Sequence, residues 1–278
     1  GIANLIQHVL KDWSSGAKNA DWERFAYYSR TFCTVDLAAF FIGTGLYYPT
    51  FFILNRGKPQ GTRSNFLKAI YPPLLRFSPY YETVIVAQIT ECNVLGIFES
   101  LSRTLLTTLV LHTSARLSTL KSHVKEFSKR CTESFSSHDR NEIMRLIVQE
   151  HQYIRSLVRR IDNAYSNVSF FTVVFNNVIV CVSGFVIMTG AGSVDTYIMG
   201  EFVLFIVWFI SQAFIFCALG EYTSKNGEAI VDAVNGIPWY KIHPKEIKTL
   251  IIILANAQQP LVLSGGKIFS LTHNSFLA

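Results

Sequence analysis

Long stretches without a charged residue alternate along this chain with stretches rich in charge. Four gaps of 19, 32, 19 and 18 residues contain no Asp, Glu, Lys or Arg, and they lie between Asp36 and Arg56, Asp162 and Asp195, Glu201 and Glu221, and Lys248 and Lys267. A helix that crosses the hydrocarbon core of a bilayer needs about 20 mainly apolar residues. Long buried helices of a soluble bundle are the alternative, but four such gaps in one chain favour spanning helices.

The pattern predicts an all-α, polytopic helical membrane protein whose single transmembrane domain fills residues 1–278. Five spanning helices are expected, at about 33–54, 83–111, 170–189, 197–219 and 249–278. The second is the least apolar, because it carries Glu91, Glu99 and Arg103. We expect the fifth to start near Pro244 and to continue to the last residue of the sequence.

Two further helices are expected outside the membrane, at about 140–165 and 222–245. In the first, apolar residues fall on one face at helical spacing, which predicts that the third span continues as a helix beyond the bilayer. These residues are Ile143, Ile147, Ile154, Leu157 and Ile161. In the second, Gly236 and Pro238 predict the end of the helix.

The distribution of Lys and Arg predicts the orientation in the membrane. Segments 1–30, 115–160 and 221–248 hold 18 basic residues, against 5 in segments 55–81 and 190–197. Basic residues concentrate on the cytoplasmic side, so we expect a cytoplasmic N-terminus in a multi-pass protein of the plasma membrane. The net charge of +6 is then explained by cytoplasmic loops, and nucleic acid is not an expected partner.

Catalytic and metal-binding motifs are absent from the sequence, so neither an enzyme nor a cofactor or metal site is expected. Glu99 and Arg103 stand four residues apart in the order that favours an ion pair within one helix, and we interpret them as a structural pair. Glu91 either lines a wet cavity or lies at the headgroup boundary. Lys267, within the fifth predicted span, either reaches the membrane surface or faces a polar interior.

A candidate ligand pocket follows from the outer halves of three predicted spans. Apolar and aromatic side chains with a few polar groups are typical of small-molecule sites, and the residues that we select are Phe41, Gly45, Tyr48, Ile89, Asn93, Phe202 and Phe205. The external segment 55–81 is rich in Tyr, Phe and Pro. It forms either a lid over this pocket or an aromatic belt at the membrane surface.

The stretch 217–278 resembles the C-terminal signature of insect odorant receptors. The matching residues include Cys217, Gly220, Trp239, Lys248, Gln258, Pro260, the run Ser264-Gly265-Gly266-Lys267, and Phe269. The segments SPYYE at 78–82 and HQYI at 151–154 match the family as well. Asn256 departs from it, because the family often has Arg there. Compared with the family, the chain begins after the second of seven spans and stops within the seventh, before the pore-gating residues.

The resemblance implies an odorant-binding receptor that assembles with a shared co-receptor subunit into a hetero-tetrameric, odorant-gated, nonselective cation channel for the sense of smell. Its ligand is a small volatile odorant, and cytoplasmic helices form the main subunit contacts. We expect Trp239, Tyr240 and Gln258 at that interface. A gustatory receptor of the same architecture and a solute transporter are the alternatives. A transporter would show an inverted repeat or paired broken helices, and neither is visible.

Overall fold

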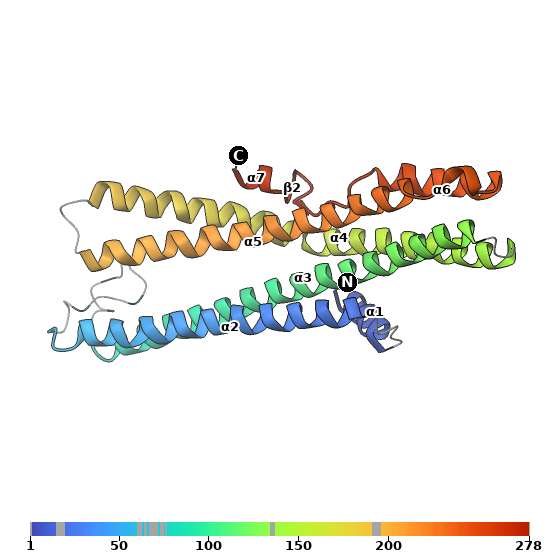
Figure 1. Cartoon of the computed structure of the whole chain (residues 1–278). Helices are drawn as coiled ribbons and strands as arrows, with labels where there is room; N and C mark the ends of the chain where they lie inside the picture. The colour runs from blue at the N-terminus through green and yellow to red at the C-terminus, as the bar shows by residue number, and fades with distance from the viewer. Residues whose placement is uncertain are drawn as a thin grey trace. The chain divides into compact units, whose positions relative to one another are not determined.

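Long helices dominate the computed structural model of the chain (Figure 1), which describes residues 2–14, 20–59, 63, 66, 72, 75, 77–133, 137–190 and 196–277. The helices and strands are α1 (Ile2–Ser14), α2 (Ala20–Asn55), α3 (Tyr80–Thr132), α4 (Ser137–Gly190), α5 (Thr196–Asn235), a 3-10 turn (Trp239–Lys241), α6 (Pro244–Ala257), β1 (Ser264–Gly265), β2 (Phe269–Ser270) and α7 (His273–Leu277).

Four of these helices, α2, α3, α4 and α5, are long and apolar enough to cross a membrane. They cover the first four spans expected from the sequence. Helix α3 contains 53 residues, which corresponds to about 80 Å, more than twice the thickness of a hydrocarbon core. Helix α4 runs without a break through both the expected span 170–189 and the expected helix 140–165. The fold is therefore all-α and polytopic, with helices that extend beyond the bilayer.

The fifth expected span, 249–278, is wrong. Helix α6 starts at Pro244 as expected but ends at Ala257 after 14 residues, and at about 21 Å it is too short to cross the bilayer. Pro260 cannot continue a helix, because it lacks a backbone N–H. The chain then forms the two-stranded hairpin β1–β2, in which Ser264 pairs with Ser270 and Gly265 with Phe269. Lys267 lies in the turn of this hairpin and not in a spanning helix.

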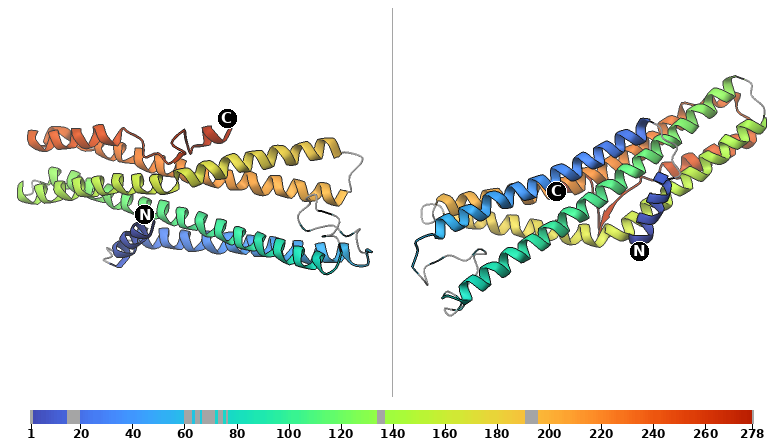
Figure 2. Two further views of the ribbon diagram at one scale, coloured as in Figure 1. Left: turned by 180° about the vertical axis from the view of Figure 1, so that it is seen from behind. Right: turned by 90° about the horizontal axis from the view of Figure 1, so that it is seen from below.

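The chain divides into two compact parts. We call residues 27–107 the helix pair, because they comprise most of α2 and the first half of α3. We call residues 1–26 and 108–278 the bundle. It contains α1, the second half of α3, and all of α4, α5, α6 and the hairpin. Within the bundle, α4 and α5 pack along each other, as both views of Figure 2 show.

The hydrophobic core of the bundle lies at the end away from the α4–α5 connection. Helices α3, α4, α5 and α6 all contribute to it, with Phe127, Ile147, Val234 and Leu250 fully buried at its centre. Packing against protein therefore explains the apolar residues Leu250, Ile253 and Leu254 of the charge-free stretch 249–266. His243 caps the start of α6, and Glu246 accepts a hydrogen bond from the backbone N–H of His243 in return.

Candidate ligand-binding site

Phe66 lies at the centre of an aromatic cluster in the helix pair. Its ring lies 5.1 Å from Tyr47, 5.4 Å from Tyr48 and 5.4 Å from Phe51, all on α2. Tyr81 at the start of α3 joins the same buried cluster. Phe66 belongs to the external segment 55–81, most of which lies outside the described residues. The described part therefore includes one side chain that folds back onto α2, and sequence reasoning did not select it.

Three of the expected pocket residues come together beside this cluster. Tyr48 and Ile89 pack against it from α2 and α3, and Asn93 stands one turn after Ile89. The Asn93 amide donates a hydrogen bond to the backbone oxygen of Ile89 at 2.7 Å. The Tyr48 hydroxyl is buried beside the Asn93 side chain, which interacts with it, although no hydrogen bond of ordinary geometry joins the two groups. An apolar and aromatic surface with one buried hydroxyl suits a small, mainly apolar ligand that offers one polar atom.

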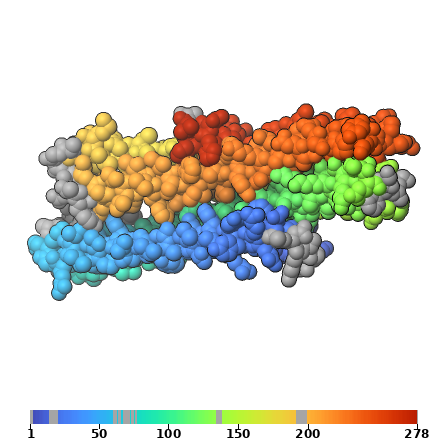
Figure 3. All heavy atoms as spheres, in the orientation of Figure 1, coloured from blue at the N-terminus to red at the C-terminus, as the bar shows by residue number. Residues whose placement is uncertain are grey.

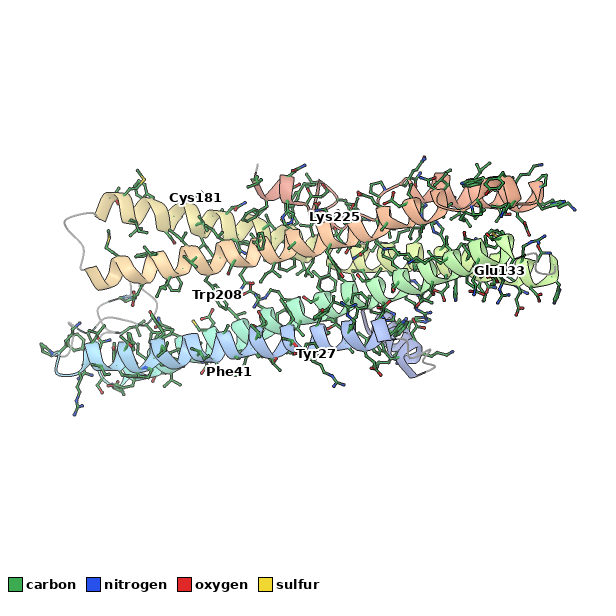
Figure 4. The ribbon with its side chains drawn as sticks, in the orientation of Figure 1. Tyr27, Phe41, Glu133, Cys181, Trp208 and Lys225 are labelled. Atoms are coloured by element: carbon green, nitrogen blue, oxygen red, sulfur yellow. The ribbon has the colours of Figure 1, made fainter. Side chains whose placement is uncertain are left out.

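The remaining expected pocket residues are more exposed. Phe41, labelled in Figure 4, exposes 57% of its surface, and a methyl group placed on Gly45 would meet no atom within 4 Å. The side of α2 that faces α3 is instead lined by Phe40, because Gly96 on α3 leaves room for its ring. Phe202 and Phe205 stand on α5 in the bundle, where Phe202 is half-buried and Phe205 is exposed.

A buried ion pair joins the two helices of the pair. Arg103 on α3 is 1% exposed and binds both carboxylate oxygens of Asp36 on α2. The expected contact with Glu99 is also present, at 3.3 Å. Sequence reasoning found Glu99 from its spacing but missed Asp36, which only marked the edge of a charge-free stretch. Glu91 is exposed on α3.

A second set of charged residues lies in the bundle, outside the expected spans. Arg116 pairs with Asp12 at 2.7 Å and with Glu150 at 3.0 Å, and its guanidinium lies over the rings of Trp22 and Tyr153. Burial raises the pKa of Asp12, but hydrogen bonds from Arg116 and Tyr153 outweigh it and leave this pKa below its usual value. Burial and the hydrogen bond to Asp12 raise the pKa of Tyr153 to about 12. This set attaches α1 to α3 and α4.

The three expected interface residues differ in exposure. Trp239 packs partly against the core of its own bundle, whereas Tyr240 exposes 86% of its surface. Gln258 is exposed and follows the last residue of α6. Ile251 and Ile252 add exposed apolar surface on α6. Tyr240 and this face of α6 are thus more accessible to a partner than Trp239.

Sites for metal chemistry are not visible in the described part of the chain. No group of three or more His, Cys, Asp or Glu side chains is placed there to hold a metal ion. The five cysteines are all free thiols.

The long apolar helices and the aromatic surface beside Tyr48 define a polytopic helical membrane protein with a candidate site for a small ligand. The sequence model of the 7tm Odorant receptor family matches residues 3–278, and the chain belongs to that family. Odorant receptor 83a of Drosophila melanogaster is 26% identical over 146 residues, which cover 51% of this chain and 31% of that protein. Odorant receptor 13a of the same species is 23% identical over 151 residues, or 49% of this chain and 35% of that protein.

Solved structures show the same fold. The insect olfactory receptor OR5 from Machilis hrabei, in complex with eugenol, matches 99% of this chain and 65% of its own with a TM-score of 0.68 and 16% identity. The same receptor in a second structure matches 99% of this chain and 70% of its own with a TM-score of 0.70. The chain spans about a third of the length of the curated relatives given above.

Proposed function

We propose that this chain is part of the odorant-binding subunit of a ligand-gated, nonselective cation channel that assembles with a shared co-receptor. The observation that carries the proposal is the family match, which extends over residues 3–278. Membership in the odorant receptor family favours smell over taste and over solute transport. The four spanning helices are consistent with a receptor embedded in the plasma membrane.

The surface around Tyr48, Ile89 and Asn93 supports a neutral volatile ligand. It offers aromatic and aliphatic contacts with one buried hydroxyl. Burial of apolar area contributes roughly 25 cal/mol per Å². At the efficiencies usual for ligands of about 10 heavy atoms, binding reaches only about micromolar affinity. A receptor of the same fold has been solved in complex with eugenol. We therefore expect responses to micromolar concentrations of neutral volatiles.

Four further residues are candidate ligand contacts. Phe41 and Gly45 lie along the same side of α2 as Tyr48, and Phe202 and Phe205 stand one turn apart on α5. Phe41 and Phe205 expose large aromatic surfaces, which are suited to contact with an apolar ligand. In this proposal, Phe41 adds to the wall formed by Tyr48, Ile89 and Asn93, and Phe202 and Phe205 are separate candidate ligand contacts on α5.

The orientation in the proposal is the one that the basic residues predict, with segments 1–30, 115–160 and 221–248 in the cytoplasm. Labelling of single introduced cysteines in intact cells tests it. A cysteine at Lys129, which is exposed near the end of α3, should react only after the cells are permeabilised. Labelling of this cysteine in intact cells would show that the orientation is the reverse of the proposed one.

Functional expression tests the receptor assignment. The full-length protein that carries this sequence should give odorant-evoked cation currents when expressed with an insect odorant co-receptor, and the co-receptor expressed alone serves as the control. Responses restricted to sugars or amino acids would contradict the assignment and favour a gustatory receptor. The variant Tyr48→Ala, when it reaches the cell surface, should need a higher concentration of the same odorant than the wild type to give the same current.

A further inference from the structure

Lys267 has an unusual backbone conformation at the tip of the β1–β2 hairpin. Its φ is +58°, and the preceding Gly266 has a φ of +62°. The backbone N–H of Ile268 donates to the oxygen of Gly265 at 3.0 Å and closes the turn. Two central residues with positive φ are typical of type I′ turns, which favour Gly and Asn. A lysine there is strained, because its Cβ crowds the backbone. Within the described ranges, Lys267 is the one residue other than glycine with a positive φ.

The hairpin is held firmly on α4 without any contribution from the Lys267 side chain. The backbone N–H and the hydroxyl of Ser264 both donate to Asp162, each at 2.7 Å. Gly266 donates to the backbone oxygen of Ser166 at 2.8 Å, and the backbone N–H of Lys267 donates to the Ser166 hydroxyl at 3.0 Å. Four hydrogen bonds to one turn of α4 thus fix the position of the tip.

The hairpin also contacts α5 closely. A methyl group placed on Gly220 would lie 2.1 Å from the backbone oxygen of Leu271, so the glycine allows the chain after β2 to lie directly against α5. The space-filling view in Figure 3 shows this C-terminal segment, in dark red, over α5.

Both contacts fall where the charge-free stretches end. Asp162 is the last charged residue of α4 before the stretch 163–194, and Glu221 is the first charged residue of α5 after the stretch 202–220. Ser264 binds Asp162 on α4, and Leu271, just after β2, lies against Gly220 on α5. The tip binds Ser166, one turn further along α4, so the hairpin lies at the polar end of both apolar stretches. In a bilayer this is the level of the lipid headgroups.

The chemistry of the tip suits that level. The Lys267 side chain is exposed, and no carboxylate of the described residues pairs with it. Ile268 beside it exposes 75% of its surface. A cation next to an exposed apolar side chain is typical of a membrane surface contact, in which the apolar group enters the boundary and the ammonium reaches a phosphate. Arg159 and Arg160 are exposed on α4 less than one turn before Asp162.

We propose that the hairpin tip binds the headgroup of an anionic phospholipid, with the Lys267 ammonium on the phosphate and Ile268 inserted beside the acyl chains. The charge of Lys267 explains why a lysine occupies a turn position that suits glycine. The proposal rests on the membrane boundary of α4 and α5 and not on odorant gating. With the cytoplasmic orientation proposed above, the lipid belongs to the inner leaflet, where anionic lipids concentrate.

Native mass spectrometry of the detergent-solubilised full-length receptor tests this proposal. The receptor is titrated with phosphatidylserine and, in parallel, with phosphatidylcholine. We expect Lys267→Gly to bind phosphatidylserine about fivefold more weakly and phosphatidylcholine unchanged. Without added lipid, this variant should melt at the same temperature as the wild type or higher, because glycine relieves the strained backbone. Weaker lipid binding together with retained stability would exclude unfolding as the cause.

Lys248→Gln is the matched control, because Lys248 is an exposed lysine on α6, away from the hairpin. It should leave both lipid affinities unchanged, and millimolar inorganic phosphate should not displace the bound lipid. Equal affinity of the wild type and Lys267→Gly for phosphatidylserine would overturn the proposal, as would equal weakening by Lys248→Gln. Displacement of the lipid by phosphate would show that the tip binds free anions, and this result would overturn the proposal as well.

Discussion

One terminal nitrogen of Arg103 donates to both carboxylate oxygens of Asp36, at 2.9 and 3.1 Å. The two residues lie 67 positions apart, on α3 and α2, and both are buried. A buried ion pair adds little net stability compared with a well-packed apolar pair, but the removal of one partner leaves an uncompensated charge.

Asp36→Ala should therefore destabilise the receptor strongly, by about 3–5 kcal/mol, whereas the double variant Asp36→Leu with Arg103→Met should recover most of that loss. Thermal melting of the purified receptor in detergent measures both. Glu99→Gln is the matched control, since Glu99 is partly exposed and its removal leaves the pair with Asp36 intact. If Glu99→Gln proved as damaging as Asp36→Ala, the buried pair would not be the important contact.

Gly220→Ala should disrupt the contact between α5 and the chain after β2. The added methyl group would lie 2.1 Å from the backbone oxygen of Leu271, which cannot move as a flexible side chain can. Overpacking of this kind costs about 1–3 kcal/mol. A lower melting temperature and faster proteolysis after residue 258 would show it. Gly184→Ala on α4 is the control, because a methyl group there meets no atom within 4 Å, and it should be neutral or slightly stabilising.

The pH dependence of stability should depend in part on His151. Burial lowers the pKa of this histidine, and the positive charge of Arg155 lowers it further. The unfolded chain takes up a proton near pH 6.5 that the folded protein resists, so folding stability falls as the pH drops below about 6.5. His151→Asn should reduce the loss of melting temperature between pH 7 and pH 5. The exposed His8 supplies the control variant His8→Asn, which should melt like the wild type across this range.

Assembly with the co-receptor should depend on Tyr240. Its ring is almost fully exposed, so Tyr240→Ser should reduce co-purification with the co-receptor while the melting temperature of the isolated subunit stays unchanged. Trp239→Ala should lower both quantities, because Trp239 also packs against the core of its own chain. If both variants co-purified fully with the co-receptor, the surface around Trp239 and Tyr240 would not belong to the interface.

Ligand selectivity should depend on the hydroxyl of Tyr48. Tyr48→Phe keeps the ring that packs against Phe66 but removes the buried hydroxyl. We expect about a two- to tenfold loss in apparent affinity for odorants that carry a hydrogen-bond acceptor, since such a bond contributes about 0.5–1.5 kcal/mol, and little change for pure hydrocarbons. Concentration–response curves in cells with the co-receptor measure both. A uniform shift for all ligands would indicate a packing defect.

The sequence by itself determined where the long apolar helices lie. Three of the four charge-free stretches fall in α2, α4 and α5, whereas α3 carries charged residues along its length. The spacing of Ile147, Ile154 and Ile161 indicates that α4 continues past its apolar half, and the helix starts at Ser137. These features are local, because composition and periodicity along one helix report which faces must avoid water. The match of the C-terminal residues to the odorant receptors was likewise readable from the sequence and is confirmed by the family match.

The tertiary structure decided which surroundings cover each apolar stretch and which residues meet across helices. The stretch 249–266 lacks charge as a spanning helix would, but it packs against the bundle core and then forms a hairpin, since an apolar side chain avoids water equally well in lipid and in protein. Phe66 joins Tyr48, and Asp36 joins Arg103, only through the register between segments that are far apart in the chain. That register depends on the packing of whole helices, which no local pattern records.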